Sequence, residues 1–174
     1  DAGRPPLLIV YALVNRPTML DLQPDRSLVR RLLERGFTVY LLDWGSPDGA
    51  DRLLELDDYI NGYLERCVRH ILRAHGIDSL DLLGVCQGGT FSLCYAALHP
   101  ARVRNLITMV TPVDFHTPDN LLSTWARGLD VDALVAAWGI VPGDLLNQAY
   151  LALQPFRLGQ QKYEHLLGAE LDAA

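Results

Sequence analysis

The sequence predicts an α/β fold in which a mostly parallel sheet carries helices on both faces. Two observations lead to this fold class. Short, continuous apolar segments alternate with longer segments whose apolar residues recur every three to four positions, and Gly or Pro residues separate them. A strict alternation of strands and helices calls for parallel strands joined by right-handed crossovers. With 174 residues, the chain is long enough for one domain with a substantial core.

The strands are expected where the apolar segments are short and end in turn residues. The first of them is uninterrupted and partly β-branched, which is typical of a strand that is buried on both faces. The predicted strands are Leu7–Val14, Phe37–Leu42, Leu80–Val85 and Val103–Val110.

Helices are expected between these strands. Asp25 can cap the first helix, and Gly36 follows it where a left-handed residue is needed to end a helix. Gly76 ends the second helix, and a proline ends the third. The predicted helices are Arg26–Arg35, Asp57–His75 and Gln87–Leu98.

The pattern changes after Pro118, because only short helical segments follow and Gly or Pro residues interrupt them. These predicted helices are Asn120–Arg127, Val131–Trp138 and Asp144–Leu153. We therefore expect residues 1–116 to form the front part of a sheet-containing core. Residues 117–174 are expected to begin a helical cap over that core, and we expect this cap to be incomplete.

The composition argues against several kinds of partner and site. With 21 acidic and 15 basic residues the net charge is −6, whereas nucleic-acid binding needs a basic face. The longest apolar run, Leu7–Val14, is too short to cross a bilayer. The three cysteines, Cys67, Cys86 and Cys94, are too few for a disulfide framework, which indicates a reducing compartment. The eight-residue spacing of Cys86 and Cys94 fits no metal-ligand spacing, so we expect no metal site. We also expect no cofactor.

One motif indicates catalysis: the segment Gly84-Val85-Cys86-Gln87-Gly88 has the Gly-x-Ser-x-Gly pattern of a nucleophile elbow, with Cys in place of Ser. A nucleophile on so sharp a turn has strained backbone angles, and side chains two positions away on either side would collide. The Gln87 amide at the helix start could stabilise an oxyanion. The alternative is that the glycines are ordinary turn residues and that Cys86 is a small buried residue. The position between a predicted strand and a predicted helix favours the elbow.

A second oxyanion donor is expected from the loop after the first strand, since that loop lies at the same edge of the sheet. Val14 and Asn15 are the nearest candidates. The alternative, that Asn15, Arg16 and Pro17 form only a turn, remains open.

A general base is harder to assign from the sequence. His116 follows a predicted strand, but hydrolases with this elbow place their histidine after further strands. Asp43 and Asp114 also follow strands, where a turn role is the better explanation for each. Residues that fit a structural role are Cys67, Cys94, His70, His75, His99 and His165. Either His116 is the base, or the chain stops before its acid and base, and we favour the second interpretation.

Six short segments, spread over nearly the whole chain, form a recognisable set. They are 7–17 (LLIVYALVNRP), 43–45 (DWG), 56–63 (LDDYINGY), 84–89 (GVCQGG), 105–115 (NLITMVTPVDF) and 117–122 (TPDNLL). Together they resemble the catalytic subunit of class III polyhydroxyalkanoate (poly-3-hydroxybutyrate) synthases. The segment with Cys followed by Gln-Gly-Gly is the most specific of them.

The resemblance implies a partial α/β-hydrolase fold with the start of a helical cap, and a Cys–Asp–His triad. It implies an acyltransferase that polymerises 3-hydroxyacyl coenzyme A into a polyester and releases coenzyme A. Cys86 would carry the acyl group, and Gln87 and Val14 would supply the oxyanion donors. The family's Asp and His lie on later strands, beyond Ala174, so we expect this segment alone to be inactive.

The resemblance also implies partners: a 3-hydroxyacyl-coenzyme A substrate, the growing polyester, a second copy of the chain and a second, non-catalytic subunit. It implies a cytoplasmic enzyme at the surface of polyester granules. Two alternatives remain open. One is a hydrolase with a cysteine nucleophile that cleaves small esters or lactones, and the other is a catalytically incomplete interaction segment.

Overall fold

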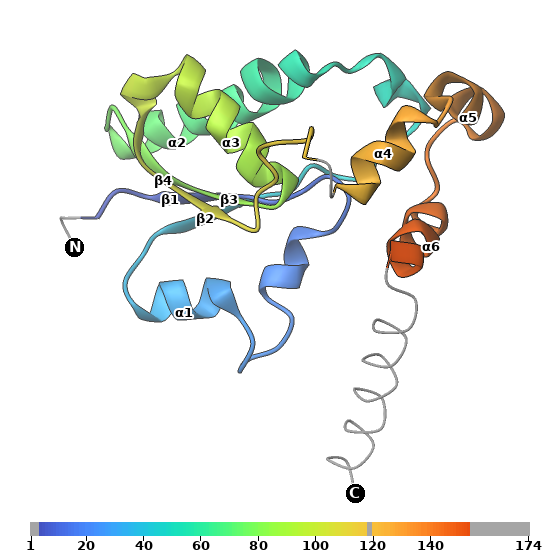
Figure 1. Cartoon of the computed structure of the whole chain (residues 1–174). Coiled ribbons are helices and arrows are strands. Elements are labelled where there is room, and N and C mark those ends of the chain that lie inside the picture. Colours follow the sequence, from blue (N-terminus) through green and yellow to red (C-terminus); the bar gives the residue numbers. More distant parts are fainter. Residues whose placement is uncertain (1–3, 118–119, 154–174) are drawn as a thin grey trace, which may run out of the picture. The chain divides into compact units, whose positions relative to one another are not determined.

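The computed structural model describes residues 4–117 and 120–153, and its first part has the predicted alternation of strands and helices (Figure 1). The strands are β1 (Leu7–Val10), β2 (Val39–Leu42), β3 (Leu80–Val85) and β4 (Val103–Met109). All neighbouring strands are parallel, and their order in the sheet is β2-β1-β3-β4. The chain divides into two compact units between Phe115 and His116.

Helices cover both faces of the sheet in the first unit, as predicted. Helices α2 (Glu65–His75) and α3 (Gln87–Leu98) lie on one face, and α1 (Leu28–Glu34) lies on the other (Figure 1). Successive side chains of β1 point to opposite faces of the sheet, as they do along any strand. Leu8 and Val10 join the buried cluster on the α2 and α3 side, whereas Leu7 and Ile9 join the cluster on the α1 side. The sheet therefore has a hydrophobic core on each face.

The first strand is shorter than predicted. It ends at Val10 rather than at Val14, because Val10 pairs with Leu42, the last residue of β2. Beyond Val10 the chain leaves the carboxyl end of the sheet. Residues 11–14 form a loop there, in which Val14 is 50% exposed. The apolar run Leu7–Val14 thus consists of a buried strand and a loop that follows it at the carboxyl end of the sheet.

The other boundaries differ by a few residues. The second strand begins at Val39 rather than at Phe37. The first helix begins at Leu28, and its N-cap is Ser27 rather than Asp25, because the Ser27 hydroxyl accepts a hydrogen bond from the Arg30 N–H at 2.8 Å. The same hydroxyl donates to a carboxylate oxygen of Asp21, which secures it at the cap position.

The long helix predicted over Asp57–His75 has two parts. Its first part, Asp58–Leu64, is a π-helix, and α2 follows directly. The spacing of apolar residues did not reveal this wider turn, since both parts keep one apolar face toward the core. Short 3-10 helices that were not predicted occupy Pro17–Leu20, Gly49–Leu53 and Pro100–Arg102.

The second unit contains α4 (Leu121–Arg127), α5 (Val131–Trp138) and α6 (Gly143–Leu153). Side chains cap the first two helices: Asn120 accepts from the Ser123 N–H at 3.1 Å, and Asp130 accepts from the Ala133 N–H at 2.9 Å. All three helices were predicted, with boundaries shifted by at most one residue. Residues 154–174 of the predicted cap, including His165, lie outside the described residues.

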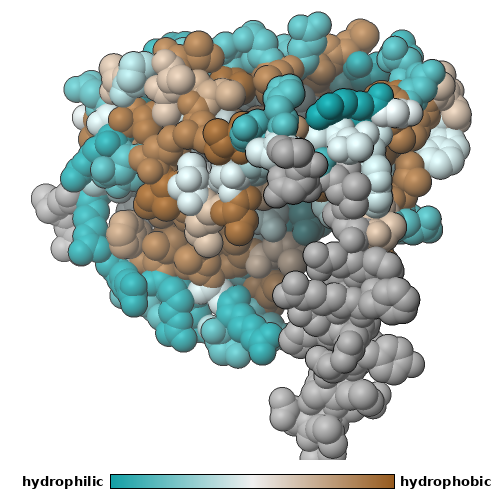
Figure 2. Space-filling model, viewed as in Figure 1, coloured by the Kyte–Doolittle hydropathy of each residue, from teal (hydrophilic) through white to brown (hydrophobic). Residues whose placement is uncertain are grey.

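Strand β4 forms one edge of the sheet among the described residues, and the segment from β4 to Phe115 exposes large apolar side chains. They are Ile107, Met109, Val110, Val113 and Phe115. Figure 2 shows hydrophobic side chains gathered on the face of the molecule where the sheet edge lies in Figure 1. Such an edge offers unpaired main-chain groups and apolar surface for a further strand. No helix in the described part of the chain is long and apolar enough to cross a membrane.

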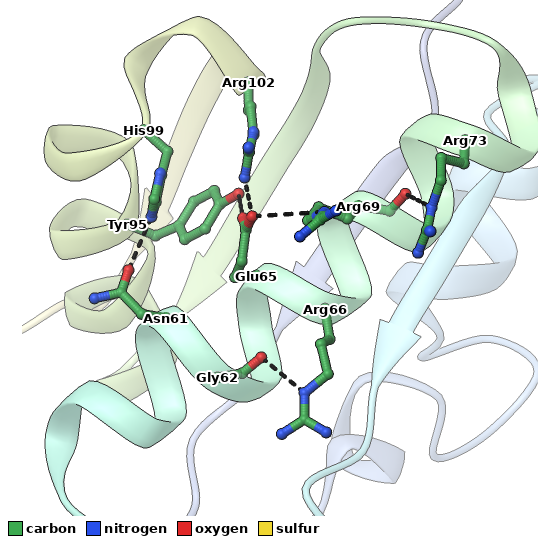
Figure 3. Close-up of polar contacts among 9 residues, drawn as sticks. All are labelled: Asn61, Gly62, Glu65, Arg66, Arg69, Arg73, Tyr95, His99 and Arg102. Carbon is green, nitrogen blue, oxygen red and sulfur yellow. Dashed lines mark hydrogen bonds and ion pairs between the residues drawn. The ribbon is translucent and has the colours of Figure 1, made fainter.

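A partly buried carboxylate, Glu65, joins the two helices on one face of the sheet (Figure 3). The Tyr95 hydroxyl of α3 donates to Glu65 Oε2 at 2.6 Å, and the Arg102 guanidinium donates to Glu65 Oε1. Burial raises the pKa of Glu65, but the hydrogen bonds from Arg102 and Tyr95 and the Arg102 charge outweigh burial and lower the pKa. Beside this group, His99 forms a 2.8 Å hydrogen bond with Asn61 of the π-helix.

Substitution Glu65→Gln is expected to lower the free energy of unfolding by about 2 kcal/mol, because Arg102 loses its ion pair in a partly buried site. The pKa of Glu65 is lowered in the fold, so its contribution is present above the ordinary carboxyl pKa and is lost as the pH falls through the folded value. The midpoint of thermal unfolding should therefore differ between wild type and variant at neutral pH and converge in acid.

The matched control is Glu34→Gln, since Glu34 pairs with Arg30 and Arg31 on the exposed surface of α1. This control should change the unfolding free energy by less than about 0.5 kcal/mol. An effect of Glu65→Gln no larger than the control would contradict the stabilising role assigned to Glu65.

Candidate active site

Cys86 lies on the sharp turn between β3 and α3, with φ 55° and ψ −127°. A positive φ is strained for a residue with a side chain. Neighbouring segments hold this conformation, because the Cys86 N–H donates to the Met109 carbonyl at 2.9 Å, and the Cys86 carbonyl accepts from the Gly89 N–H at 2.9 Å. The Cys86 side chain is exposed. The turn thus presents a thiol at the carboxyl end of the sheet.

The two glycines that flank Cys86 lie where a Cβ atom has no room. A Cβ on Gly84 would lie 2.8 Å from the Ser92 hydroxyl and 2.9 Å from the Gly88 carbonyl oxygen. A Cβ on Gly88 would lie 2.6 Å from the Tyr11 carbonyl oxygen and would also contact the Val10 carbonyl group. The sharp turn therefore brings the start of α3 against the end of β1, and this contact depends on glycine.

Main-chain N–H groups without a partner among the described residues occur at the start of α3 and in the loop after β1. The N–H groups of Gln87 and Gly88, at the start of α3, have no hydrogen-bond partner among the described residues. The Val14 N–H has none among them either. The N-terminus of a helix also favours negative charge. The oxyanion donors predicted from the sequence, Gln87 and Val14, are among these groups.

The loop after β1 is attached to the elbow by contacts that the sequence did not predict. The Leu13 N–H donates to the side-chain oxygen of Gln87, Oε1, at 3.1 Å. Trp44, which follows β2, donates from its indole N–H to the Tyr11 carbonyl at 2.9 Å. Trp44 also packs edge to face against Phe91 of α3, with 5.8 Å between the ring centroids. No local spacing signals these contacts, because the partners are far apart in sequence.

The environment differs between Cys86 and Cys67. Cys67 lines an apolar pocket of about 480 Å³ together with Leu13, Trp44 and Tyr59. Burial raises the pKa of the Cys67 thiol and outweighs the opposing effect of the Arg66 charge, which disfavours the nucleophilic thiolate. Cys94 packs against the buried cluster on the same face of the sheet, as expected of a core residue. Of the three cysteines, Cys86 alone is exposed.

Tyr11 is a neighbour of Cys86 that the sequence did not single out. Burial raises the pKa of the Tyr11 hydroxyl, and the charge of an ionised Cys86 raises it further. Both effects favour the protonated, neutral form of Tyr11 beside the thiol.

The other candidate residues have structural contacts. Asp43 accepts from the Gly45 N–H at 3.0 Å, which is the turn role expected of it. Asn15 accepts from the Arg16 N–H at 2.9 Å, a contact within the loop after β1. His75 forms a 2.9 Å hydrogen bond with Tyr40. His116 belongs to the second unit, whereas Asp114 belongs to the first.

Relatives of this chain have a common description. Poly(3-hydroxyalkanoate) polymerase subunit PhaC of Allochromatium vinosum is 62% identical over 167 residues, which are 96% of this chain and 47% of that protein. PhaC of Synechocystis sp. is 54% identical over 164 residues, covering 91% of this chain and 43% of that protein. PhaC of Haloferax mediterranei is 45% identical over 163 residues, which cover 92% of this chain and 33% of that protein. The chain spans about half the length, or less, of these relatives.

Solved structures share the fold. Lipase BlEst2 of Bacillus licheniformis superimposes with a TM-score of 0.54 at 18% identity, covering 82% of this chain and 54% of that one. An extracellular alpha/beta-hydrolase from a Paenibacillus species has a TM-score of 0.50 at 13% identity, covering 70% and 49%. The family described as the alpha/beta hydrolase fold matches residues 5–152. With its parallel sheet and its sharp strand-to-helix turn, this chain belongs to the α/β-hydrolase family.

Proposed function

We propose that this chain is the nucleophile-bearing part of a poly(3-hydroxyalkanoate) polymerase, and that Cys86 carries the acyl group during synthesis. The observation that carries the proposal is the exposed thiol on a strained turn at the start of α3, in a chain 62% identical to a PhaC polymerase subunit. The N–H groups of Gln87 and Gly88 in that first turn have no partner among the described residues. Cys67 is a poorer nucleophile, because burial raises its pKa.

The proposed reaction has two acyl transfers. In the first, the Cys86 sulfur bonds to the carbonyl carbon of a 3-hydroxyacyl-coenzyme A, the bond from that carbon to the coenzyme A sulfur breaks, and coenzyme A leaves with the proton of Cys86. One thioester replaces another, so the acyl group stays activated. In the second, a hydroxyl oxygen of another monomer or of the polymer bonds to the carbonyl carbon. The carbon–sulfur bond to Cys86 then breaks, and the hydroxyl proton returns to the thiol.

The oxyanion of each tetrahedral intermediate is assigned to the N–H groups of Gln87 and Val14. Donors that are already oriented stabilise such a charge without reorganising as it forms. Both N–H groups lack partners among the described residues, which supports this assignment.

The acid and the base of a Cys–Asp–His triad are proposed to come from other parts of the complete polymerase, so that residues 1–174 alone would not turn over. The PhaC relatives are at least twice as long as the part matched here, since the chain spans 47% of the Allochromatium protein. The exposed apolar edge at β4 supports the proposal, because further strands could pair there.

The family resemblance supports further proposals about the surroundings of the active site. We propose that the helices from α4 onward belong to a cap that excludes water from the acyl-enzyme, since water would release a free acid instead of polymer. We also propose a homodimer, a second non-catalytic subunit and a cytoplasmic location at the surface of polyester granules.

The test is to supply the complete polymerase with 3-hydroxybutyryl-coenzyme A and to measure coenzyme A, free 3-hydroxybutyrate and polyester. The proposal predicts that coenzyme A release is matched by ester bonds in polymer. Release matched by free acid, with no polymer, would instead indicate a cysteine hydrolase. The absence of coenzyme A release would overturn the polymerase proposal, and the hydrolase would then be tested by cleavage of small esters or lactones.

A further inference from the structure

The side chain of Gln87 makes a contact that the reaction described above does not use. Its oxygen, Oε1, accepts a hydrogen bond from the Leu13 N–H at 3.1 Å, in a partly buried position and across 74 positions of sequence. The main-chain N–H of Gln87 belongs to the first turn of α3, where N–H groups have no hydrogen-bond partner within the helix. Gln87 thus presents a donor to the site and uses its side chain to hold the neighbouring loop.

The loop that Gln87 holds contains the second proposed oxyanion donor. Leu13 and Val14 are consecutive, so the Gln87 side chain occupies one N–H of the loop and leaves the next one without a partner among the described residues. Val14 is itself 50% exposed, so its side chain does little to fix its backbone. The hydrogen bond to Leu13 ties the backbone immediately before Val14 to the elbow.

The start of the loop is held independently of Gln87. Trp44 donates to the Tyr11 carbonyl at 2.9 Å, and Gly88 lies against the carbonyls of Val10 and Tyr11. Loss of the Gln87 side-chain bond would leave these contacts in place. It would release only the later part of the loop, at Leu13 and Val14, and leave the fold intact.

We propose that Gln87 is a positioning residue whose side chain, by accepting the Leu13 N–H, aims the Val14 N–H at the oxyanion that forms at Cys86. This inference rests on the proposed acyl transfer at Cys86 and adds the group that sets the geometry of the oxyanion site. Displacement of a donor by a fraction of an ångström weakens its hydrogen bond to the oxyanion of the transition state more than its bond to the carbonyl oxygen of the bound substrate.

The experiment compares two reactions of the same thiol in the complete polymerase. Acylation by 3-hydroxybutyryl-coenzyme A in a single turnover passes through an oxyanion, whereas alkylation by iodoacetamide displaces iodide and forms none. Substitution Gln87→Met keeps the length of the side chain and the main-chain N–H but removes the acceptor. We expect acylation of Cys86 to slow roughly 10- to 100-fold, while its rate of alkylation stays at the wild-type value.

The control variant is Thr90→Val, on the same turn of α3. The Thr90 hydroxyl donates to the Pro112 carbonyl at 2.8 Å, so this variant also removes one side-chain hydrogen bond to a neighbouring loop. Both rates should be close to wild type in Thr90→Val, and the two variants should unfold at similar temperatures. If Gln87→Met does not fold, Gln87→Asn serves instead, since its amide is one carbon too short to reach Leu13.

The results distinguish the positioning role of Gln87 from the proposed acyl transfer at Cys86. Wild-type acylation in the Gln87 variant, or an equal loss of acylation and alkylation, would overturn the positioning role. A wild-type polymerase that is alkylated at Cys86 but never acylated there would overturn the proposed function, and the inference with it.

Discussion

Substitution Cys86→Ala in the complete polymerase is expected to reduce the release of coenzyme A from 3-hydroxybutyryl-coenzyme A by about 10^4-fold or more. The reason is that no other described cysteine can replace the lost nucleophile. Burial raises the pKa of Cys67, and Cys94 packs against the hydrophobic core. The measurement is the initial rate of coenzyme A release at saturating substrate.

The controls for this prediction are Cys67→Ala and Cys94→Ala, which test the other two cysteines under the same conditions. Each should retain coenzyme A release within about tenfold of wild type, because each removes a packed side chain and no reacting group. If Cys67→Ala were as inactive as Cys86→Ala while folding normally, the assignment of a single nucleophile would be wrong.

Substitution Gly88→Ala is expected to lower the free energy of unfolding by about 3 kcal/mol or more, or to prevent folding. The added methyl group would lie 2.6 Å from the Tyr11 carbonyl oxygen and would also press on the Val10 carbonyl group. Both neighbours are backbone at the end of a central strand, so they cannot rotate away as a side chain can. Chemical denaturation or the yield of folded protein measures the effect.

Gly49→Ala is the matched control, because nothing lies within 4 Å of its added Cβ and its φ is not in the left-handed region. It should change stability by less than about 0.5 kcal/mol. A Gly88→Ala variant as stable as Gly49→Ala would mean that α3 and β1 do not approach each other as described.

Features with a local sequence signal were predicted well. The strand Leu80–Val85 and the helix Gln87–Leu98 have the predicted boundaries, since Gly84 and Gly88 define the turn between them within a few residues. The alternation of strands and helices also predicted the parallel sheet, because a helix that connects two strands carries the chain back so that both strands run in the same direction.

Features that depend on distant residues were not predicted. The end of β1 at Val10 is set by where its neighbour β2 stops, which the apolar run up to Val14 does not reveal. The bond between Gln87 and Leu13 joins segments that meet only in the folded sheet. The same holds for Glu65, whose partners Tyr95 and Arg102 lie 30 and 37 positions away.

The most direct test of the account is to find where the acyl group resides during synthesis. The complete polymerase, stopped in acid during turnover of 3-hydroxybutyryl-coenzyme A, would be digested and its peptides weighed by mass spectrometry. An acyl-Cys86 intermediate predicts the added mass of a hydroxybutyryl group or a short oligomer on the peptide that contains Cys86. An acyl group found only on another residue, or polymer synthesis with Cys86 unmodified throughout, would contradict it.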